Sequence, residues 1–310
     1  MNRKRWLALV LFLLVLAVAV GLGRLAAPAK GEGRWQEAAL FGQGEKVLLL
    51  ELKGTIPTDK ALEDFLSQVR QAREDESVRA VVLYVESPGG GVTETEAVHR
   101  ALTALAREKP LVASFGTVAA SGGYYAATAA REILTPPTAL TGSIGVIATL
   151  PRVQGLLAKL GLEVEVLKEG RLKDMASGLR PLSPEEKAIL QRYLREAYEL
   201  FVKRVAEGRK MPLEKAYRLS DGRIYSGQQA VALGLADREG YLEDAARRAA
   251  ELAGLQSFRL VRYIRPKGLF QALLGEESPL GLSSEAEALL KALSQARFRL
   301  EYRYLGGGLW

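Results

Sequence analysis

The stretch "PLVASFGTVAASGGYYAATAA" (110–130) is typical of a buried strand that turns sharply into a helix of small residues. Its first half is a largely apolar run of strand length. Ser121 stands at the turn and is followed by two glycines and two tyrosines. Serine is a favoured helix N-cap, and it is also the nucleophile in sharp strand-to-helix turns of hydrolases. The stretch alone therefore leaves open a packed helix start or a catalytic serine.

The same alternation continues on the N-terminal side. Buried strands are expected in "KVLLLELKGTI" (46–56) and "RAVVLYVESPGGG" (79–91), and helices over 59–74 and 94–107. Continuous rather than alternating hydrophobicity in strands that alternate with helices predicts an α/β fold with a parallel sheet covered on both faces. The carboxyl ends of such strands meet at one edge, so we expect the Gly89–Gly91 turn and Ser121 to lie together there.

The boundaries of helices and strands are less clear in the rest of the chain. Residues 132–148 are expected to be extended, and Ser183 with Glu186 forms a capping box that starts a long helix with Pro184 at its first position. Further helices are expected between 212 and 253. We predict a main domain over 46–255, a Gly-, Ala- and Glu-rich tether over 24–45, and a C-terminal segment over 256–310 that forms an oligomer contact or a membrane-facing rim.

The N-terminus carries a membrane signal. The run "WLALVLFLLVLAVAVGLG" (6–23) holds no charge and follows Arg3, Lys4 and Arg5. As a helix it would span about 27 Å, close to the ~30 Å hydrocarbon core. The positive-inside rule then predicts a cytoplasmic stub and transmembrane anchor over 1–23, a single pass through the membrane, and an extracytoplasmic location for the rest of the chain. The alternative is a cleaved signal peptide with a site at Ala27-x-Ala29, although the apolar run exceeds the usual length.

Composition excludes several kinds of chemistry. The 310 residues are 48% hydrophobic and include no cysteine and one histidine. Disulfides and a cysteine nucleophile are therefore excluded, and a zinc site is disfavoured, so we expect neither metal nor cofactor. The net charge is +7, but no basic stripe with interleaved aromatic residues is present. Nucleic acid is therefore not expected as a partner.

A catalytic serine needs a base, and the single histidine is His99, on the helix expected over 94–107. A lone histidine on a helix is usually a surface or packing residue. A lysine can serve instead if burial keeps it neutral, as in Ser-Lys hydrolases. Spacing alone does not choose among four candidate lysines: Lys159, Lys168, Lys173 and Lys187. The glycines of "SPGGG" expose backbone N–H groups suited to an oxyanion, whereas nucleotide-binding glycine motifs do not match.

Five motifs in order carry a family resemblance: "VESPGGGV", "VAASGGYYAATAA", "LTGSIGVI", "GRLKDMASG…PLSPEE" and "GRIYSGQQAVALGLAD". Together they resemble bacterial signal peptide peptidase A, a membrane-bound Ser-Lys protease of the Clp-protease/crotonase superfamily. The resemblance covers roughly 46–245. It implies a short form with one catalytic unit per chain, a homo-oligomeric ring, and degradation of hydrophobic peptides, mainly signal peptides left in the membrane. Glu86 departs from the family, which often has Asn at that position.

The resemblance also implies roles for individual residues. Ser121 would be the nucleophile, Lys173 the general base and Ser143 the hydroxyl that orients the lysine. Gly90 and Gly122 would supply the oxyanion hole. Val92, Tyr124, Tyr125 and Ile144 are expected either to line an apolar substrate groove or to pack in the core. The alternatives are a related protease with a different membrane-protein target and a non-catalytic scaffold of the same fold; acyl-CoA chemistry is disfavoured by the extracytoplasmic placement.

Overall fold

The computed structural model describes residues 35–265 and 300–303. The chain divides into two units, Met1–Gln36 and Glu37–Trp310, and the architecture below is that of the second. Its centre is a sheet in the order β1-β11-β2-β3-β5-β6-β10. The strands are β1 (Gln36–Gly42), β2 (Glu45–Lys53), β3 (Val78–Ser87), β5 (Leu111–Ala120), β6 (Glu132–Thr135), β10 (Arg238–Glu239) and β11 (Phe258–Ile264).

The pairing is parallel from β11 through β2, β3, β5 and β6 to β10, as the hydrophobic pattern predicts. At the carboxyl end of β5, β7 (Leu140–Gly142) pairs in parallel with it and in antiparallel fashion with β9 (Ile224–Ser226). The strands are rich in Val, Leu and Ala, whose side chains can be buried on both faces of a parallel sheet.

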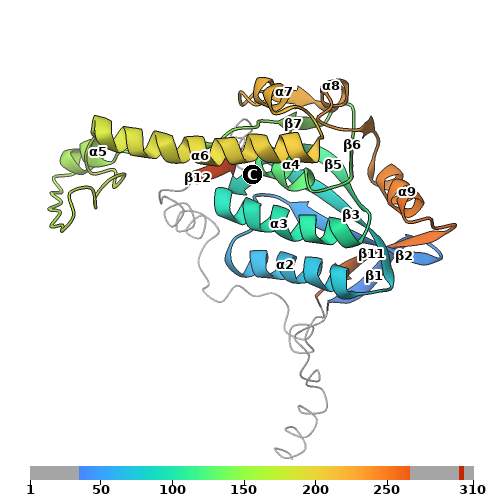
Figure 1. The fold of residues 1–310 in the computed structure, drawn as a ribbon. Helices are drawn as coiled ribbons and strands as arrows, with labels where there is room; N and C mark the ends of the chain where they lie inside the picture. Colours follow the sequence, from blue (N-terminus) through green and yellow to red (C-terminus); the bar gives the residue numbers. More distant parts are fainter. Residues whose placement is uncertain (1–34, 266–299, 304–310) are drawn as a thin grey trace, which may run out of the picture. The chain divides into compact units, whose positions relative to one another are not determined.

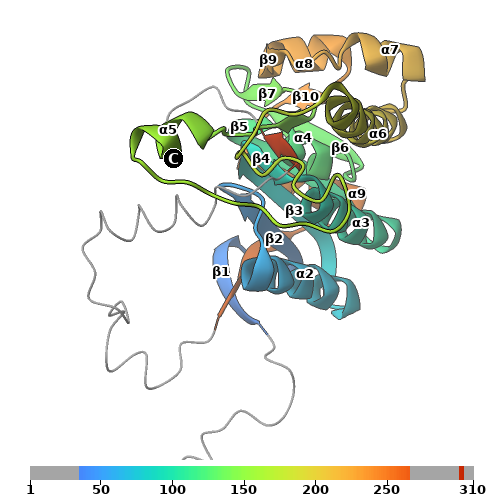
Figure 2. The same cartoon turned by 90° about the vertical axis from the view of Figure 1, so that its left-hand side faces the viewer.

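Helices cover the two faces of the sheet (Figure 1, Figure 2). On one face Val47, Ala80 and Val82 pack with the alanines of α9 (Leu242–Leu252) in a buried cluster. The intervening residues of the same strands point to the other face, because successive side chains alternate. There α2 (Asp59–Glu74) contacts β2 and β3, and α3 (Val92–Glu108) packs between α2 and α4 (Gly122–Ala127).

The remaining helices of the described residues are α5 (Gln154–Lys159), α6 (Pro184–Gly208), α7 (Leu213–Arg218) and α8 (Gly227–Leu233). The predicted capping box at the start of α6 is confirmed: the Glu186 N–H donates to Ser183 Oγ at 3.2 Å, and the Ser183 N–H donates to Glu186 Oε2 at 2.8 Å. No helix within the described ranges is long and apolar enough to cross a membrane. The anchor predicted over 1–23 lies outside them.

Two predicted boundaries differ from the structure. The tether expected over 24–45 is too long, because Gln36–Gly42 forms the edge strand β1. The domain does not end at 255, since β11 lies between β1 and β2 in the main sheet. A second, small sheet joins β4 (Gly89–Gly91), β12 (Leu300–Arg303) and β8 (Ile147–Ala148). A piece of the C-terminal segment thus pairs with the glycine turn, which the sequence pattern did not predict.

Candidate active site

Ser121 occupies a strained turn between β5 and α4. Its φ of 52° and ψ of −118° lie outside the regions that residues with a side chain normally adopt, which costs about 1–3 kcal/mol. The Ser121 N–H donates to the Gly142 carbonyl, and the Ser121 carbonyl accepts from the Tyr125 N–H, both at 2.8 Å. The serine is almost fully buried. The structure therefore holds this residue at a strand end in the conformation expected of a nucleophile turn.

Ser143 is held next to Ser121 by the same strand pairing. It follows Gly142 directly, has a φ of 49°, and donates its N–H to the Arg223 carbonyl at 2.8 Å. Both serines line a cavity of about 410 Å³. The other lining residues are Ile144, Gly145, Val146, Ile147, Tyr198, Ser220, Asp221, Gly222 and Arg303. Two of the predicted site residues are thus brought together, and Ile144 lies beside them.

The glycine turn meets the serine turn, as the strand-end argument predicts. A Cβ added to Gly89, whose φ is +102°, would lie 2.7 Å from the Gly122 nitrogen. A Cβ on Gly90 would lie 2.6 Å from the Ile56 Cβ. The backbones of "SPGGG" and "SGG" are therefore in direct contact at Gly89, and a residue with a side chain could not fit there. Gly90 and Gly122 lie in this arrangement as predicted; the contribution of Gly89 was not anticipated.

The strand β12 occupies the groove beside these glycines. It pairs antiparallel with β4, Tyr302 opposite Gly90, and with β8, Glu301 opposite Ile147. The Tyr302 carbonyl oxygen lies 1.9 Å from the Cβ position of Gly89 and 3.0 Å from that of Gly122. The next residue, Arg303, lines the cavity that contains Ser121. An extended segment of polypeptide therefore lies across the site with one carbonyl against the two glycine turns.

Lys173 is not brought to Ser121 within the chain. It lies in an exposed turn between α5 and α6, and it is not among the residues that line the Ser121 cavity. The burial that a neutral lysine base requires is therefore not supplied by one copy of the chain.

A network of ion pairs fixes the turn that carries Lys173. The next residue, Asp174, accepts two hydrogen bonds from Arg180, each of 2.8 Å, and a third from Lys168. Arg180 also donates to Glu186 at 2.8 and 2.5 Å, and Glu186 is the buried partner in the α6 capping box. Hydrogen bonds from Arg180 and Lys168 hold the pKa of Asp174 well below its usual range. The turn is thereby attached to the capped end of α6.

The predicted groove residues separate into two groups. Tyr125 stacks on Tyr302, with ring centroids 5.1 Å apart and an angle of 28° between the planes. Val92 is half-buried at the start of α3, directly after the glycine turn. Tyr124 instead points into the core, where its hydroxyl donates to the Leu235 carbonyl at 2.8 Å. Tyr124 is therefore a packing residue and not part of the groove.

His99 is buried behind the site. Its ring packs edge-on against Tyr125, with centroids 5.1 Å apart, and it is not among the residues lining the Ser121 cavity. Burial lowers the pKa of His99 to about 4, against the raising effect of Glu96. Among the described residues its Nδ1 has no hydrogen-bond partner. His99 is therefore a packing residue, as its position on the helix suggests.

Glu86 supports the serine strand from the side. Its carboxylate accepts from the Thr117 N–H at 2.6 Å and from the Val118 N–H at 3.1 Å, where β5 leaves its regular register with β3. A Cβ on Gly116 would lie 1.8 Å from Glu86 Oε2. The residue that departs from the family pattern thus closes the bulge that leads to Ser121.

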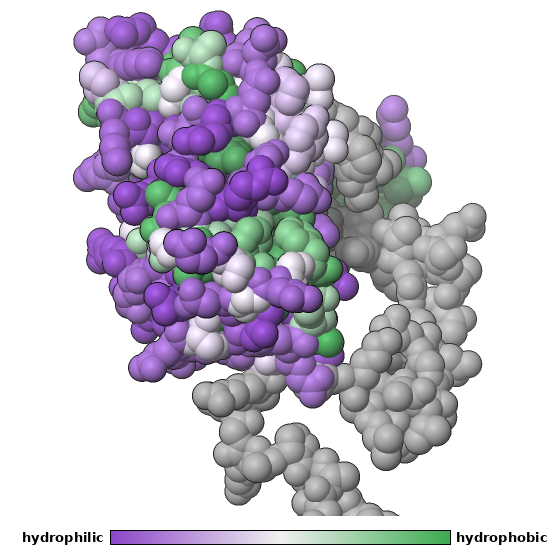
Figure 3. Space-filling view, turned by 90° about the vertical axis from the view of Figure 1, so that its right-hand side faces the viewer, coloured by the Kyte–Doolittle hydropathy of each residue, from purple (hydrophilic) through white to green (hydrophobic). Residues whose placement is uncertain are grey.

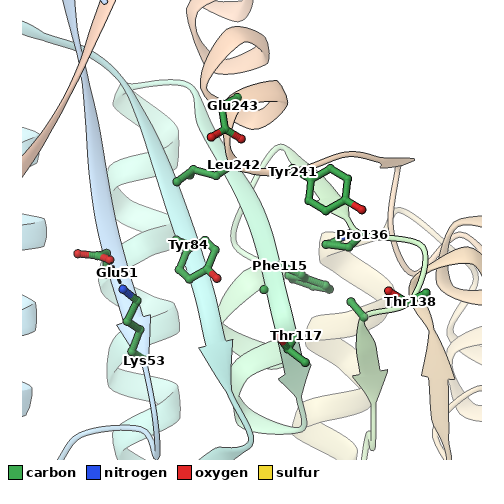
Figure 4. A pocket seen from close by; sticks show the side chains of 12 residues that line it. Glu51, Lys53, Tyr84, Phe115, Thr117, Pro136, Thr138, Tyr241, Leu242 and Glu243 are labelled. Carbon is green, nitrogen blue, oxygen red and sulfur yellow. Dashed lines mark hydrogen bonds and ion pairs between the residues drawn. The ribbon is translucent and has the colours of Figure 1, made fainter. Parts of the chain in front are cut away.

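A second cavity, of about 540 Å³, lies between α9 and the sheet and shares no lining residue with the Ser121 cavity. Figure 4 shows its lining side chains, with Glu51 and Lys53 joined by an ion pair. The Lys53 ammonium also lies 5.4 Å from the centre of the Tyr84 ring.

Figure 3, which looks at the molecule from the right-hand side of Figure 1, shows apolar side chains gathered in a band between hydrophilic margins. The larger cavity contains none of the predicted catalytic residues.

Comparison with known proteins agrees with this geometry. Residues 103–256 match peptidase family S49, and residues 45–140 match the Clp protease family. The chain is 38% identical to a Synechocystis protein assigned as a protease, over 86% of this chain and 95% of that protein. It is 34% identical to an Enterococcus faecium protein assigned as the signal peptide peptidase SppA, over 79% and 80% of the two chains. It is 37% identical to Protease 4 of Salmonella typhi, of which it covers 36%.

These relatives match the chain across both the glycine turn and the serine turn, whose contact the structure shows. The site holds a strained serine, two glycine turns in backbone contact and an extended strand across them. The chain belongs to peptidase family S49 and is a serine protease.

Proposed function

We propose that the chain is a membrane-anchored endopeptidase that cuts apolar peptides, mainly signal peptides left in the membrane, with Ser121 as nucleophile and Lys173 of a neighbouring copy as base. The observation that carries the peptidase assignment is β12, an extended strand whose Tyr302 carbonyl lies against Gly89 and Gly122. A substrate bound in the same way would add a strand between β4 and β8. Its backbone would then provide affinity whatever its side chains are.

The chemistry follows from this placement. Lys173, neutral once a neighbouring copy buries it, takes the proton from Ser121 Oγ as that oxygen attacks the substrate carbonyl. Backbone N–H groups of Gly90 and Gly122 stabilise the oxyanion, and losing one such donor costs ~2.7–4 kcal/mol. The protonated lysine passes its proton to the leaving amine. Water then hydrolyses the acyl-enzyme on Ser121.

The exposed segment around Lys173 supports a base that acts between copies. Large apolar side chains over 153–167 are exposed in the single chain: Val153, Leu156, Leu160, Leu162, Val164, Val166 and Leu167. Such a patch on a soluble domain is normally covered by a partner. In a ring of identical chains, covering this segment would also bury the turn of Lys173 and bring it to the Ser121 of its neighbour.

Mixing two inactive variants tests the shared site. Ser121→Ala and Lys173→Ala should each abolish cleavage of a fluorogenic apolar peptide, because one lacks the nucleophile and the other the base. When the two purified variants are dissociated, mixed and reassembled, activity should return, since some sites combine an intact serine with an intact lysine. A mixture that reassembles to the native oligomer size and stays inactive would contradict the shared site. Full activity in Lys173→Ala alone would exclude the Ser-Lys dyad.

Membrane placement rests on the uncharged run from Trp6 to Gly23 and the basic residues before it. Signal peptides are apolar helices released within the bilayer, so an anchored protease on the outer side would meet them at the surface. The test is fractionation of the full-length chain, followed by cleavage of a purified signal peptide in competition with a stomatin-type membrane protein. Preferential cleavage of the membrane protein would favour the alternative target.

A further inference from the structure

We propose that Asp221 is a positioning residue for the reaction, because its ion pair with Arg223 fixes the loop whose backbone holds Ser143 beside Ser121. This inference rests on the proposed function and on the expected role of Ser143, whose hydroxyl would orient the lysine base. Asp221 also lines the cavity that contains both serines. It belongs to the loop over 219–223, which connects α7 to β9.

This loop is the main-chain support of the segment that carries Ser143. The Arg223 carbonyl accepts the Ser143 N–H at 2.8 Å, at the end of the pairing between β7 and β9. The same carbonyl oxygen lies 3.0 Å from the Cβ position of Gly142. The Gly222 Cα lies 3.7 Å from the Cβ position of Gly145. The loop therefore contacts the segment on both sides of Ser143, and a displaced loop would displace that serine.

The backbone of Ser143 needs this support. Its φ of 49° lies in the left-handed region, which residues with a side chain rarely adopt. Such a conformation persists only where the surrounding contacts hold it in place. The direction of the Ser143 hydroxyl follows from this backbone conformation, so the hydrogen bond to the Arg223 carbonyl also determines where the hydroxyl can reach.

Asp221 fixes Arg223 through both the backbone and the side chain. The Arg223 N–H donates to Asp221 Oδ1 at 3.1 Å. The guanidinium donates from Nε to Oδ1 at 2.8 Å and from a terminal nitrogen to Oδ2 at 2.5 Å. These hydrogen bonds lower the pKa of Asp221, so the carboxylate stays ionised at neutral pH. A two-bond pair of this kind defines geometry as well as attraction. It closes the tight turn at Gly222, whose φ is +89°.

The other end of the loop has separate attachments. The Tyr225 hydroxyl donates to the Leu219 carbonyl at 3.0 Å, and the Ser220 hydroxyl donates to the Ala216 carbonyl at 2.6 Å. Neither of these bonds involves Asp221. Loss of the ion pair should therefore loosen the turn that holds Ser143 and leave the rest of the loop in place.

The ion pair is too exposed to contribute much to folding. The Arg223 and Asp221 side chains are 63% and 48% exposed. Water screens such pairs, and their contribution to stability is small. Asp221→Asn should therefore change Tm by no more than about 4 °C. A loss of rate that exceeds this loss of stability would distinguish a positioning residue from a merely structural one.

Steady-state kinetics of the full-length chain on a fluorogenic peptide tests the role. Asp221→Asn and Arg223→Gln each remove the ion pair, and we expect each to lower kcat by about 10-fold with KM unchanged. Asp221→Ala also removes the acceptor of the Arg223 N–H, so its loss should reach up to about 100-fold, as for a displacement of about 1 Å. An unchanged kcat in Asp221→Asn and Arg223→Gln would overturn the proposal.

A double-mutant cycle tests whether Asp221 acts through Ser143. Ser143→Ala removes the hydroxyl that the loop is proposed to position. In that background Asp221→Asn should cause no further loss of kcat, because there is no hydroxyl left to misplace. Losses that multiply in the double variant would show that Asp221 acts independently of Ser143. Full activity in Ser143→Ala together with a loss in Asp221→Asn would overturn the proposal in the same way.

The pH dependence of kcat/KM separates positioning from a direct effect of charge on the lysine. Asp221→Asn removes a negative charge and Arg223→Gln removes a positive one. If position matters, both variants lower the rate and leave the midpoint of the profile unchanged. Midpoints that shift in opposite directions would contradict the positioning role. Glu214→Gln is the matched control, because it breaks an exposed ion pair with Arg218 on α7, and its kcat should equal that of the wild type.

Ser121→Ala and Lys173→Ala, measured in parallel, keep the two proposals apart. Wild-type activity in either of them would refute the proposed peptidase chemistry, whatever the Asp221 variants do. Loss of activity in both, with wild-type kcat in Asp221→Asn and Arg223→Gln, would refute the role of Asp221 alone. Each variant is compared at the oligomer size of the wild type, so that a defect in assembly is not read as a defect in the site.

Discussion

Replacing Gly89 with alanine adds one methyl group at the point where the two glycine turns and the bound strand meet. The φ of Gly89 is +102°, so an alanine there is strained, at a cost of about 1–3 kcal/mol. Its Cβ would also lie 2.7 Å from the Gly122 nitrogen and 1.9 Å from the Tyr302 carbonyl oxygen. Both atoms belong to the backbone, so relief requires the turns to separate.

Separation should remove the Gly122 amide from the oxyanion. Loss of one such donor lowers kcat by about 10²–10³. We therefore expect Gly89→Ala to lose at least about 100-fold in kcat/KM on a fluorogenic peptide. The strain should also lower Tm by about 2–12 °C, given about 2–4 °C per kcal/mol for a domain of this size. Steady-state kinetics and thermal unfolding measure the two effects separately.

Gly254→Ala is the matched control. Gly254 also has a positive φ, +71°, but nothing lies within 4 Å of its Cβ position. The control should lose stability through backbone strain and keep its activity. Wild-type activity in Gly89→Ala would refute the assignment of the glycine turn to the site. An equal loss of activity in Gly254→Ala would show that the effect comes from strain alone.

Three further outcomes are expected. Burial lowers the pKa of His99 to about 4, so the neutral histidine contributes fully to stability above pH ~6.5, and about 3 kcal/mol of unfolding free energy is lost as the pH falls to ~4. Denaturant unfolding should show this loss for the wild type and not for His99→Phe. The activity of His99→Phe near neutral pH should be unchanged. Glu86→Ala should cost about 1–3 kcal/mol in unfolding free energy because two backbone donors lose their acceptor, and Glu86→Gln should recover part of it. Arg180→Met should lower kcat more than it changes KM, because the turn that carries Lys173 loses its attachment to α6. Arg180→Lys should restore only part of the rate, since a lysine cannot bridge the carboxylates of Asp174 and Glu186. An unchanged kcat in Arg180→Met would contradict the positioning role.

Much of the fold could be predicted because its signals are local. The helix expected over 59–74 is observed at Asp59–Glu74, since its apolar residues recur at helical spacing. The α6 start could be predicted from Ser183 and Glu186, whose reciprocal hydrogen bonds need only three residues of separation. The edge strand β1 was missed because it carries a mostly exposed side-chain pattern without a buried run.

The site could be predicted only as far as strand ends determine it. Ser121, Ser143 and the glycine turn converge because they follow neighbouring parallel strands. Tyr124 and Tyr125 are adjacent and chemically identical, and packing alone sends one to the core and the other to Tyr302. No local signal distinguishes them, because the difference lies in which partners surround each ring.

The alternation of strands and helices, the serine turn and the glycine turn can be predicted from the sequence, because periodicity and turn chemistry act over a few residues. The position of β12 in the groove and the exposure of Lys173 become evident only in the folded chain. Both depend on contacts between segments far apart in the chain, or between copies of the chain. Such contacts depend on which surfaces fit together and bury apolar area, and no short stretch of sequence carries that information. Ser121 illustrates both cases. Its sequence neighbours predict the turn, and its strained φ of 52° is found where β5 pairs with β7 in the folded chain.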